Sequence, residues 1–248
     1  MRSIRALIAP SLLPVLMIAS ALAPWPGCIG GEVVQRSYFT LDYPMDRVAE
    51  GVKPHGVTVL VRRFATDLAY DKNEVVYRQS PYSFGYYTYK LWASKPRKML
   101  QQLVTTHFRR SEVVSEITDQ LGDSEPTYEL RGEVMAIEEV NSSDEQWLAR
   151  LSLRLWLTKY GQRRVVWSWE FDETRPVPER SPFFVVKTLS EILASQLDEA
   201  TRDLDARLES VSGGIEPVTP KVKKPKAPKV TTPEVPPDRV EPSATRIR

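Results

Sequence analysis

The chain has 248 residues with 34 basic and 32 acidic side chains, so its formal net charge is only +2. This balance provides no concentrated basic face, and nucleic acid is therefore not an expected partner. A single cysteine excludes a disulfide within the chain, while 42% hydrophobic residues are sufficient to fill a core.

The first 27 residues have the pattern of a secretory signal. Arg2 and Arg5 form a basic start, residues 6–23 are uncharged and mostly apolar, and the small Gly27 precedes Cys28. This order of charged, apolar and small residues describes a cleaved signal and not a membrane-spanning helix. Removing it leaves roughly 220 residues, which suits one domain with tails.

The position of Cys28 indicates a lipid anchor. A signal that ends at a lone cysteine resembles a bacterial lipobox, in which the cysteine receives acyl chains such as palmitate and becomes the mature N-terminus. Trp25 and Pro26 depart from the usual lipobox residues. The alternative is ordinary cleavage that leaves a free thiol, which is a liability in an oxidising compartment. We expect lipidation at Cys28, because several acyl chains together hold a protein firmly at a membrane.

Hydrophobic periodicity and turn residues predict two helices and a series of strands. In chain order, the expected strands cover residues 33–43, 57–64, 74–78 and 86–92, then 128–140, 147–158 and 165–171. The expected helices cover residues 94–110, with Ser94 as N-cap and Pro96 in the first turn, and residues 183–211. Gly132 interrupts the first long strand, and a glycine there is typical of a bulge or a close approach of another group.

These elements predict an α/β (α+β) sandwich with a mainly antiparallel sheet. The last three strands alternate apolar and polar residues and are joined by short turns, so they should form an antiparallel meander with one covered face. The long helix has one apolar stripe and can cover that meander together with the first helix. The expected organisation is a signal at 1–27, an anchor linker at 28–36, a domain at 37–211 and a tail at 212–248.

The tail is rich in proline and lysine and contains almost nothing that can be buried, which predicts a disordered or polyproline-like segment. Composition favours a solubilising role. A basic arm that reaches an acidic surface or the peptidoglycan layer is the alternative.

The sequence contains no constellation typical of catalysis, so an enzyme is not expected. His55 and His107 lack metal-ligand spacing, and no phosphate-binding glycine loop is present, so neither a metal nor a cofactor is expected. Glu138 and Glu139 are adjacent, but neighbouring residues on a strand point to opposite faces. They are therefore a poor acid–base pair.

An aromatic run offers the main candidate contact surface. Tyr82, Phe84, Tyr86 and Tyr87 lie close together in sequence, and tyrosine suits surfaces that are half exposed to water. Plain strand packing is the competing interpretation and should account for at least half of the rings in the run. Tyr82 and Phe84 lie in the expected turn and should be the most exposed.

Several short motifs, in a fixed order after the lipoprotein cysteine, together resemble one known family. They are Tyr-Phe-Thr-Leu at 38–41, Val-Tyr-Arg at 76–78, Tyr-Tyr at 86–87, Trp-Ala at 92–93 with Pro96, Leu100 with Leu103, and Tyr-Glu-Leu-Arg-Gly at 128–132. In this order and spacing the chain resembles the ABC-type transport auxiliary lipoproteins, over about residues 37–208. That family includes the lipoprotein component of the paraquat-inducible intermembrane transport system.

The resemblance implies a non-catalytic lipoprotein on the periplasmic face of the envelope, at the outer membrane, because no aspartate follows Cys28. It implies that the protein acts together with a mammalian-cell-entry (MCE) protein, and with a permease and an ATPase on separate chains. Together these proteins would move lipids between the two membranes and maintain membrane integrity. Two other hypotheses stay open at this stage. One is a lipoprotein that binds a lipid ligand on its own, and the other is a structural lipoprotein that contacts peptidoglycan. A homo-oligomer is also left open.

Overall fold

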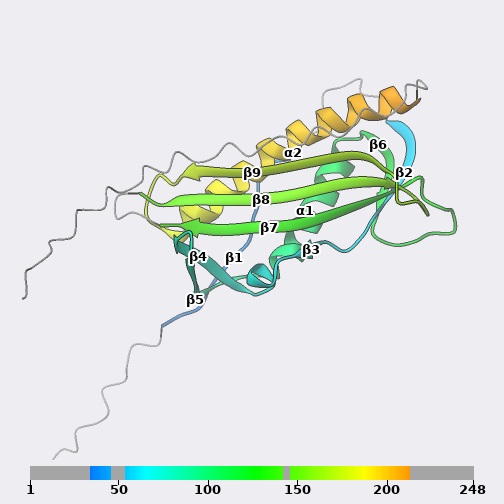
Figure 1. Cartoon of the computed structure of the whole chain (residues 1–248). Coiled ribbons are helices and arrows are strands. Elements are labelled where there is room, and N and C mark those ends of the chain that lie inside the picture. Colours follow the sequence, from blue (N-terminus) through cyan, green and yellow to red (C-terminus); the bar gives the residue numbers. More distant parts are fainter. Residues whose placement is uncertain (1–33, 46–53, 142–145, 213–248) are drawn as a thin grey trace, which may run out of the picture. The chain divides into compact units, whose positions relative to one another are not determined.

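The computed structural model describes residues 34–45, 54–141 and 146–212. The signal, Cys28 and the tail beyond residue 212 lie outside the described residues. Figure 1 shows the elements in chain order. They are β1 (Ser37–Phe39), β2 (His55–Val61), β3 (Ala65–Thr66), the 3-10 helix η2 (Leu68–Tyr70), β4 (Glu74–Ser80), β5 (Ser83–Trp92), α1 (Pro96–Arg110), β6 (Val114–Thr118), β7 (Tyr128–Val140), β8 (Leu148–Lys159), β9 (Val165–Pro176) and α2 (Pro182–Ser212).

The described strands form one mixed sheet organised around β7. One side of β7 pairs in parallel with three strands in succession, β2 at residues 128–130, β3 at 133–134 and β4 at 138–140. Its other side pairs with β8 in antiparallel fashion, and β8 continues to β9. Two further pairings, β1 with β5 and β2 with β6, are parallel, whereas β4 and β5 form an antiparallel hairpin.

The expectation of a mainly antiparallel sheet is therefore wrong, although the antiparallel meander of β7, β8 and β9 is confirmed. Among the described strands more pairings are parallel than antiparallel. Parallel neighbours require long crossover connections, and the connection between the parallel neighbours β2 and β6 includes α1. Local periodicity in a sequence shows which residues share a face, but it does not show how distant strands pair.

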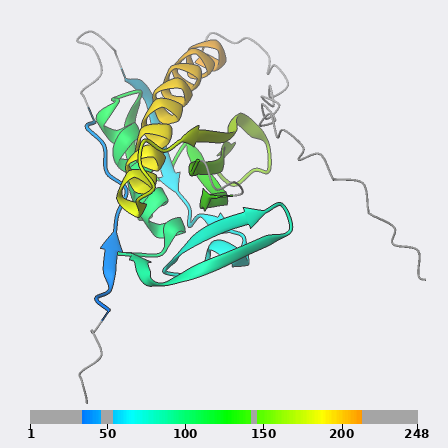
Figure 2. The same ribbon diagram turned by 90° about the vertical axis from the view of Figure 1, so that its left-hand side faces the viewer.

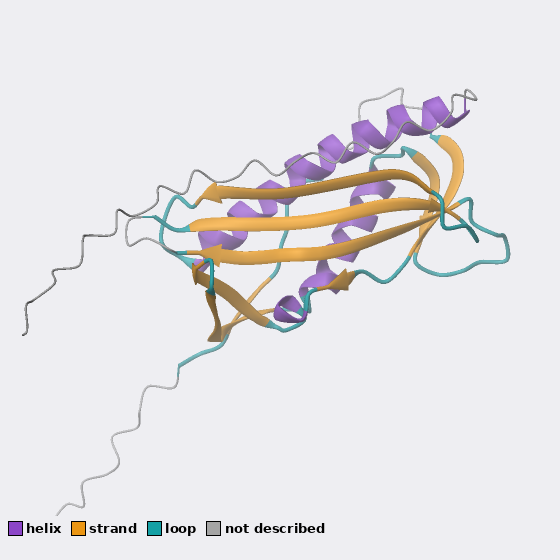
Figure 3. Cartoon of the chain, in the orientation of Figure 1, coloured by secondary structure: helices purple, strands orange, loops and turns teal. Residues whose placement is uncertain are grey.

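Both helices pack on one face of the sheet, which curls around them (Figure 2). Figure 3 shows the helices as one layer behind the strands. The apolar residues of β8 that alternate inward are fully or almost fully buried beneath α2; they are Leu151, Leu153, Leu155 and Leu157. Burying one such side chain contributes about 1.5–3 kcal/mol before entropy is counted. Within the described ranges, neither helix has the length and apolar character needed to cross a bilayer.

Several boundaries differ from the sequence predictions. Helix α1 begins at Pro96 with Lys95, not Ser94, as its N-cap, and the side chain of Lys95 makes no capping hydrogen bond to the helix. Of the strand expected at 33–43, the described residues 34–43 form only the three-residue strand β1, which is the length over which the chain pairs with β5. The short strands β3 and β6 were not predicted. Strand β3 has only two residues, and β6 has five residues of which two are buried. Such short segments show too little periodicity to be recognised in the sequence.

Gly132 on β7 marks a close approach, as predicted. A Cβ atom at this position would lie 2.5 Å from the ring of Phe64. Phe64 is itself buried in the core. The contact requires a residue without a side chain, so this glycine is explained by packing of an aromatic ring against the strand.

Candidate functional site

The exposed tip of the β4–β5 hairpin is the candidate contact site, and we call residues 80–84 the hairpin tip. Tyr82 lies in the turn and is 98% exposed, and Phe84 at the start of β5 is 42% exposed. The backbone N–H of Tyr82 donates to Oγ of Ser80 over 3.3 Å. Two large aromatic side chains thus reach solvent where the chain reverses.

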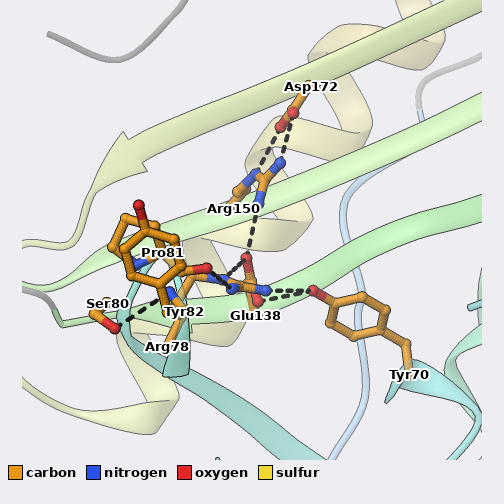
Figure 4. Close-up of polar contacts among 8 residues, drawn as sticks. All are labelled: Tyr70, Arg78, Ser80, Pro81, Tyr82, Glu138, Arg150 and Asp172. Carbon is orange, nitrogen blue, oxygen red and sulfur yellow. Dashed lines mark hydrogen bonds and ion pairs between the residues drawn. The ribbon is translucent and has the colours of Figure 1, made fainter. Parts of the chain in front are cut away.

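Arg78 on β4 connects the hairpin tip to the sheet (Figure 4). Its Nη1–H donates to the backbone carbonyl of Pro81 over 3.4 Å, and its guanidinium lies 5.5 Å from the ring centre of Phe84. Its Nε–H donates to Oε1 of Glu138 over 2.8 Å. One side chain therefore contacts both the tip and a carboxylate in the middle of the sheet.

Glu138 is the centre of a buried polar network that crosses four strands. It is fully buried and accepts hydrogen bonds from Tyr70 Oη over 2.8 Å and from Arg150 Nη1 over 3.0 Å, besides Arg78. Arg150 also binds both oxygens of Asp172 on β9, over 2.8 and 2.7 Å. Paired carboxylates and guanidiniums of this kind tolerate burial because each charge has a partner.

The pKa values in this network move in directions that keep its charges fixed. Burial, together with the Glu138 carboxylate, raises the pKa of Tyr70 to about 12. Hydrogen bonding to Glu138 raises the pKa of Arg78, and hydrogen bonding to Asp172 raises that of Arg150. Tyr70 therefore stays neutral and the two arginines stay charged at neutral pH, so the network acts as a fixed support for the hairpin tip.

The structure separates the four predicted contact residues. Tyr86 is half-buried, its hydroxyl donates to the carbonyl of Ala69 over 3.2 Å, and its ring meets Phe84 edge-on at 5.8 Å. Tyr87 points to the opposite face of β5, where its hydroxyl donates to Glu139 Oε1 over 2.7 Å. Only Tyr82 and Phe84 therefore combine large size with exposure, while Tyr86 supports Phe84 from below.

Glu138 and Glu139 contact different partners on opposite faces, as predicted. Glu139 is fully buried, and its Oε2 has no hydrogen-bond partner among the described residues. Burial raises the pKa of Glu139 above its usual value, although the hydrogen bond from Tyr87 and the charge of Lys90 act against the rise. The same burial lowers the pKa of Lys90. The two carboxylates are not in contact and therefore cannot act as an acid–base pair.

The two histidines lie apart from the hairpin tip. Nε2 of His55 lies 2.8 Å from Asp205, and Nδ1 of His107 lies 3.2 Å from the hydroxyl of Tyr43. Burial lowers the pKa of His107. In the parts of the chain that the structure describes, no three His, Cys, Asp or Glu side chains are grouped to hold a metal ion.

Sequence reasoning missed the network around Glu138. A usable signal was present, because Glu138 lies in a predominantly apolar strand and Arg78 and Arg150 lie in other strands at positions that alternate with apolar residues. The carboxylate needed a cation, but only the strand pairing identifies which one. Cys28, the predicted anchor, lies outside the described residues.

The fold is a curled mixed sheet with two helices on one face, and it carries an exposed aromatic hairpin tip. A family model for the ABC-type transport auxiliary lipoprotein component matches residues 39–200. The chain belongs to the ABC-type transport auxiliary lipoprotein family. The protein is therefore an auxiliary lipoprotein component of an ABC-type transport system, which implies association with other transporter components.

Solved structures share this fold. A crystal structure of a Xanthomonas campestris protein assigned to family DUF330 has a TM-score of 0.62 at 18% identity, covering 71% of this chain and 99% of that one. A second, described only as an uncharacterized protein, has a TM-score of 0.54 at 19% identity, covering 68% of this chain and 99% of that one. None of the curated proteins matches this chain in sequence.

Proposed function

We propose that the protein is the lipoprotein component of an MCE-type transporter that moves lipids between the inner and outer membranes. Cys28 would anchor it to the periplasmic face of the outer membrane. The hairpin tip would contact the MCE protein, and the permease and ATPase would be separate chains. Membership of the auxiliary lipoprotein family supports a non-catalytic role in transport.

The observation that favours the hairpin tip as the contact is the combination of exposure and rigidity. Tyr82 and Phe84 project into solvent, while Arg78 fixes the hairpin to the buried Glu138. Large aromatic residues on a rigid support lose little conformational entropy when they bind, and such residues dominate the binding energy of many interfaces. A tip of this kind is suited to binding a protein partner and not to catalysing a reaction.

The test is site-specific photo-crosslinking in intact cells, with the crosslinker at Tyr82. We expect a covalent product with an MCE protein, identified by mass spectrometry. The matched control places the crosslinker at Leu121, which is also exposed but lies in the loop before β7. A second control, Cys28→Ser, removes the anchor and should abolish the product if assembly depends on the membrane.

The alternatives predict other outcomes. Recovery of peptidoglycan-associated proteins alone, together with loss of function on deleting residues 213–248, would support the structural role. A stand-alone lipid-binding role predicts lipid that remains bound after purification and no MCE product. Between α1 and α2 the described residues leave a hollow of about 200 Å³, lined by Met45, His107, Arg110 and Asp198 among others. This volume lies below the roughly 300–1,000 Å³ of typical ligand pockets, so the hollow does not favour a lipid ligand.

A further inference from the structure

A second candidate site lies at the other end of β7 from the hairpin tip. A hollow of about 410 Å³ opens on the sheet face that points away from the helices, beside the turn between β8 and β9. We call it the arginine hollow, and it is lined by Arg131, Trp156, Thr158, Gln162, Arg163 and Val165. Figure 1 shows this turn and the β4–β5 hairpin at opposite ends of β7.

Strand register builds the floor of the arginine hollow. Arg131 on β7 lies directly opposite Trp156 on β8, and Glu129 lies opposite Thr158. Side chains at such paired positions are neighbours on one face of a sheet. Gly161 adopts a positive φ of 67° in the turn that follows, and this turn carries Gln162 and Arg163 to the rim.

The charges around the arginine hollow are not balanced. Glu129 accepts hydrogen bonds from both Arg62 and Arg131, the latter over 2.9 Å. Although burial acts in the other direction, these two guanidiniums hold the pKa of Glu129 below its usual range. Arg163 has no ion-pair partner among the described residues. Two guanidiniums thus bind one carboxylate at the floor, and Arg163 on the rim adds a third, so these four side chains carry an excess of two positive charges.

The rest of this sheet face lacks such an excess. Arg154 lies between Glu133 and Glu170, at 3.5 and 2.6 Å. Farther along, the two arginines of the Glu138 network face two carboxylates. Positive charge is therefore concentrated at one end of the face, although the net charge of the whole chain is only +2.

Two uncharged side chains add to the arginine hollow. Thr158 is buried, and its Oγ1 has no hydrogen-bond partner within the part of the chain that the structure describes. A buried hydroxyl without a partner is costly. Trp156 is half-buried and presents an indole ring beside Arg131, an arrangement that suits a boundary between water and apolar groups.

From this geometry we infer that the arginine hollow binds a phosphate group, either free or in the head group of an anionic lipid. Guanidinium groups match phosphate oxygens in fork-like hydrogen bonds and remain charged at every physiological pH. The volume falls within the range of pockets that hold small ligands. Arg131 and Arg163 would contact the phosphate oxygens, and Trp156 would contact the adjoining carbon atoms.

The experiment is isothermal titration calorimetry of the purified full-length lipoprotein in uncharged detergent. The two probes are inorganic phosphate and dihexanoyl phosphatidylglycerol, a water-soluble anionic lipid. We expect saturable binding of at least one probe, reduced about five-fold by Arg163→Gln and more by Arg131→Gln with Arg163→Gln. Arg163→Gln alone leaves the ion pairs of Glu129 intact, so it tests the hollow without disturbing its floor.

The matched control is Arg154→Gln, on the same face of β8 but in a cluster where carboxylates outnumber the arginine. It should bind both probes as the unaltered protein does. Binding of the lipid alone would identify a head group, and binding of both probes or of phosphate alone would identify a general phosphate site. Absence of binding, an equal loss in Arg154→Gln, or preferential binding of an acidic peptide would overturn the inference.

Failure of this test would leave the proposed transport role untouched, because the arginine hollow and the hairpin tip lie at opposite ends of β7. Conversely, loss of the crosslink at Tyr82 would not change binding of phosphate. The two experiments therefore fail independently.

Discussion

Arg78 on β4 donates its Nε–H to the fully buried Glu138 on β7 over 2.8 Å, and this contact joins the hairpin tip to the middle of the sheet. Glu138 also accepts hydrogen bonds from Arg150 and Tyr70. Because the carboxylate has three partners, its removal affects β4, β8 and the 3-10 helix η2 together.

Glu138→Ala should destabilise the protein by about 3–5 kcal/mol, because it leaves two arginines without their shared buried counter-charge. Denaturant-induced unfolding measures the change. The control is Glu133→Ala, which removes a partly exposed partner of Arg154 and should cost only about 0.2–1 kcal/mol. Equal losses of stability in the two variants would show that the buried carboxylate of Glu138 contributes no more than the partly exposed carboxylate of Glu133.

Replacing Tyr82 and Phe84 with serine should weaken binding of the transport partner while leaving stability nearly unchanged. Exposed side chains away from core contacts usually change stability by no more than about 0.5 kcal/mol, and Tyr82 is 98% exposed. Thermal unfolding and quantitative co-purification measure the two effects. A large fall in melting temperature would instead mark Phe84 as part of the packing around Tyr86 and Arg78.

Glu139→Gln should raise stability at neutral pH. Burial raises the folded pKa of this carboxyl above its usual value of 4.5, so the folded protein binds the proton more tightly than the unfolded chain. The stabilising contribution of Glu139 to the free energy of unfolding is therefore complete below about pH 4.5 and is lost as the pH rises through the folded pKa. Each unit of difference between the folded and unfolded pKa values corresponds to about 1.4 kcal/mol of stability.

A glutamine cannot ionise, and its carbonyl can still accept the hydrogen bond from Tyr87. The free energy of unfolding of Glu139→Gln should therefore fall less with rising pH than that of the unaltered protein. Unfolding titrations between pH 4.5 and neutrality provide the comparison. Parallel pH profiles for the two proteins would show that Glu139 titrates normally.

Gly132→Ala should destabilise the protein by about 1–3 kcal/mol, the usual cost of overpacking a core, because the new Cβ would lie 2.5 Å from the Phe64 ring. Adding Phe64→Leu should recover part of the loss. Gly56→Ala on β2 is the matched control, since the added Cβ would have no atom within 4 Å in the described structure. Similar losses in the two alanine variants would point to a backbone effect and not to the ring.

The long elements were predictable because their periodicity extends over many residues. The strand expected at 128–140 coincides with β7, and the long helix extends only one residue beyond the expected range at each end. The exposure of Tyr82 and Phe84 also followed from their place beside a turn. The opposite orientations of Glu138 and Glu139 followed from strand geometry alone.

The sequence by itself determined the long elements, their buried faces, the resemblance to the family and the candidate anchor at Cys28. Only the tertiary structure decided that β2, β3 and β4 share one side of β7, that Glu138 joins Arg78 to Arg150, and that Arg131 and Arg163 meet at one hollow. Periodicity is a local property of the chain. Strand pairing instead depends on contacts between residues far apart in sequence, and those contacts determine which charges face one another.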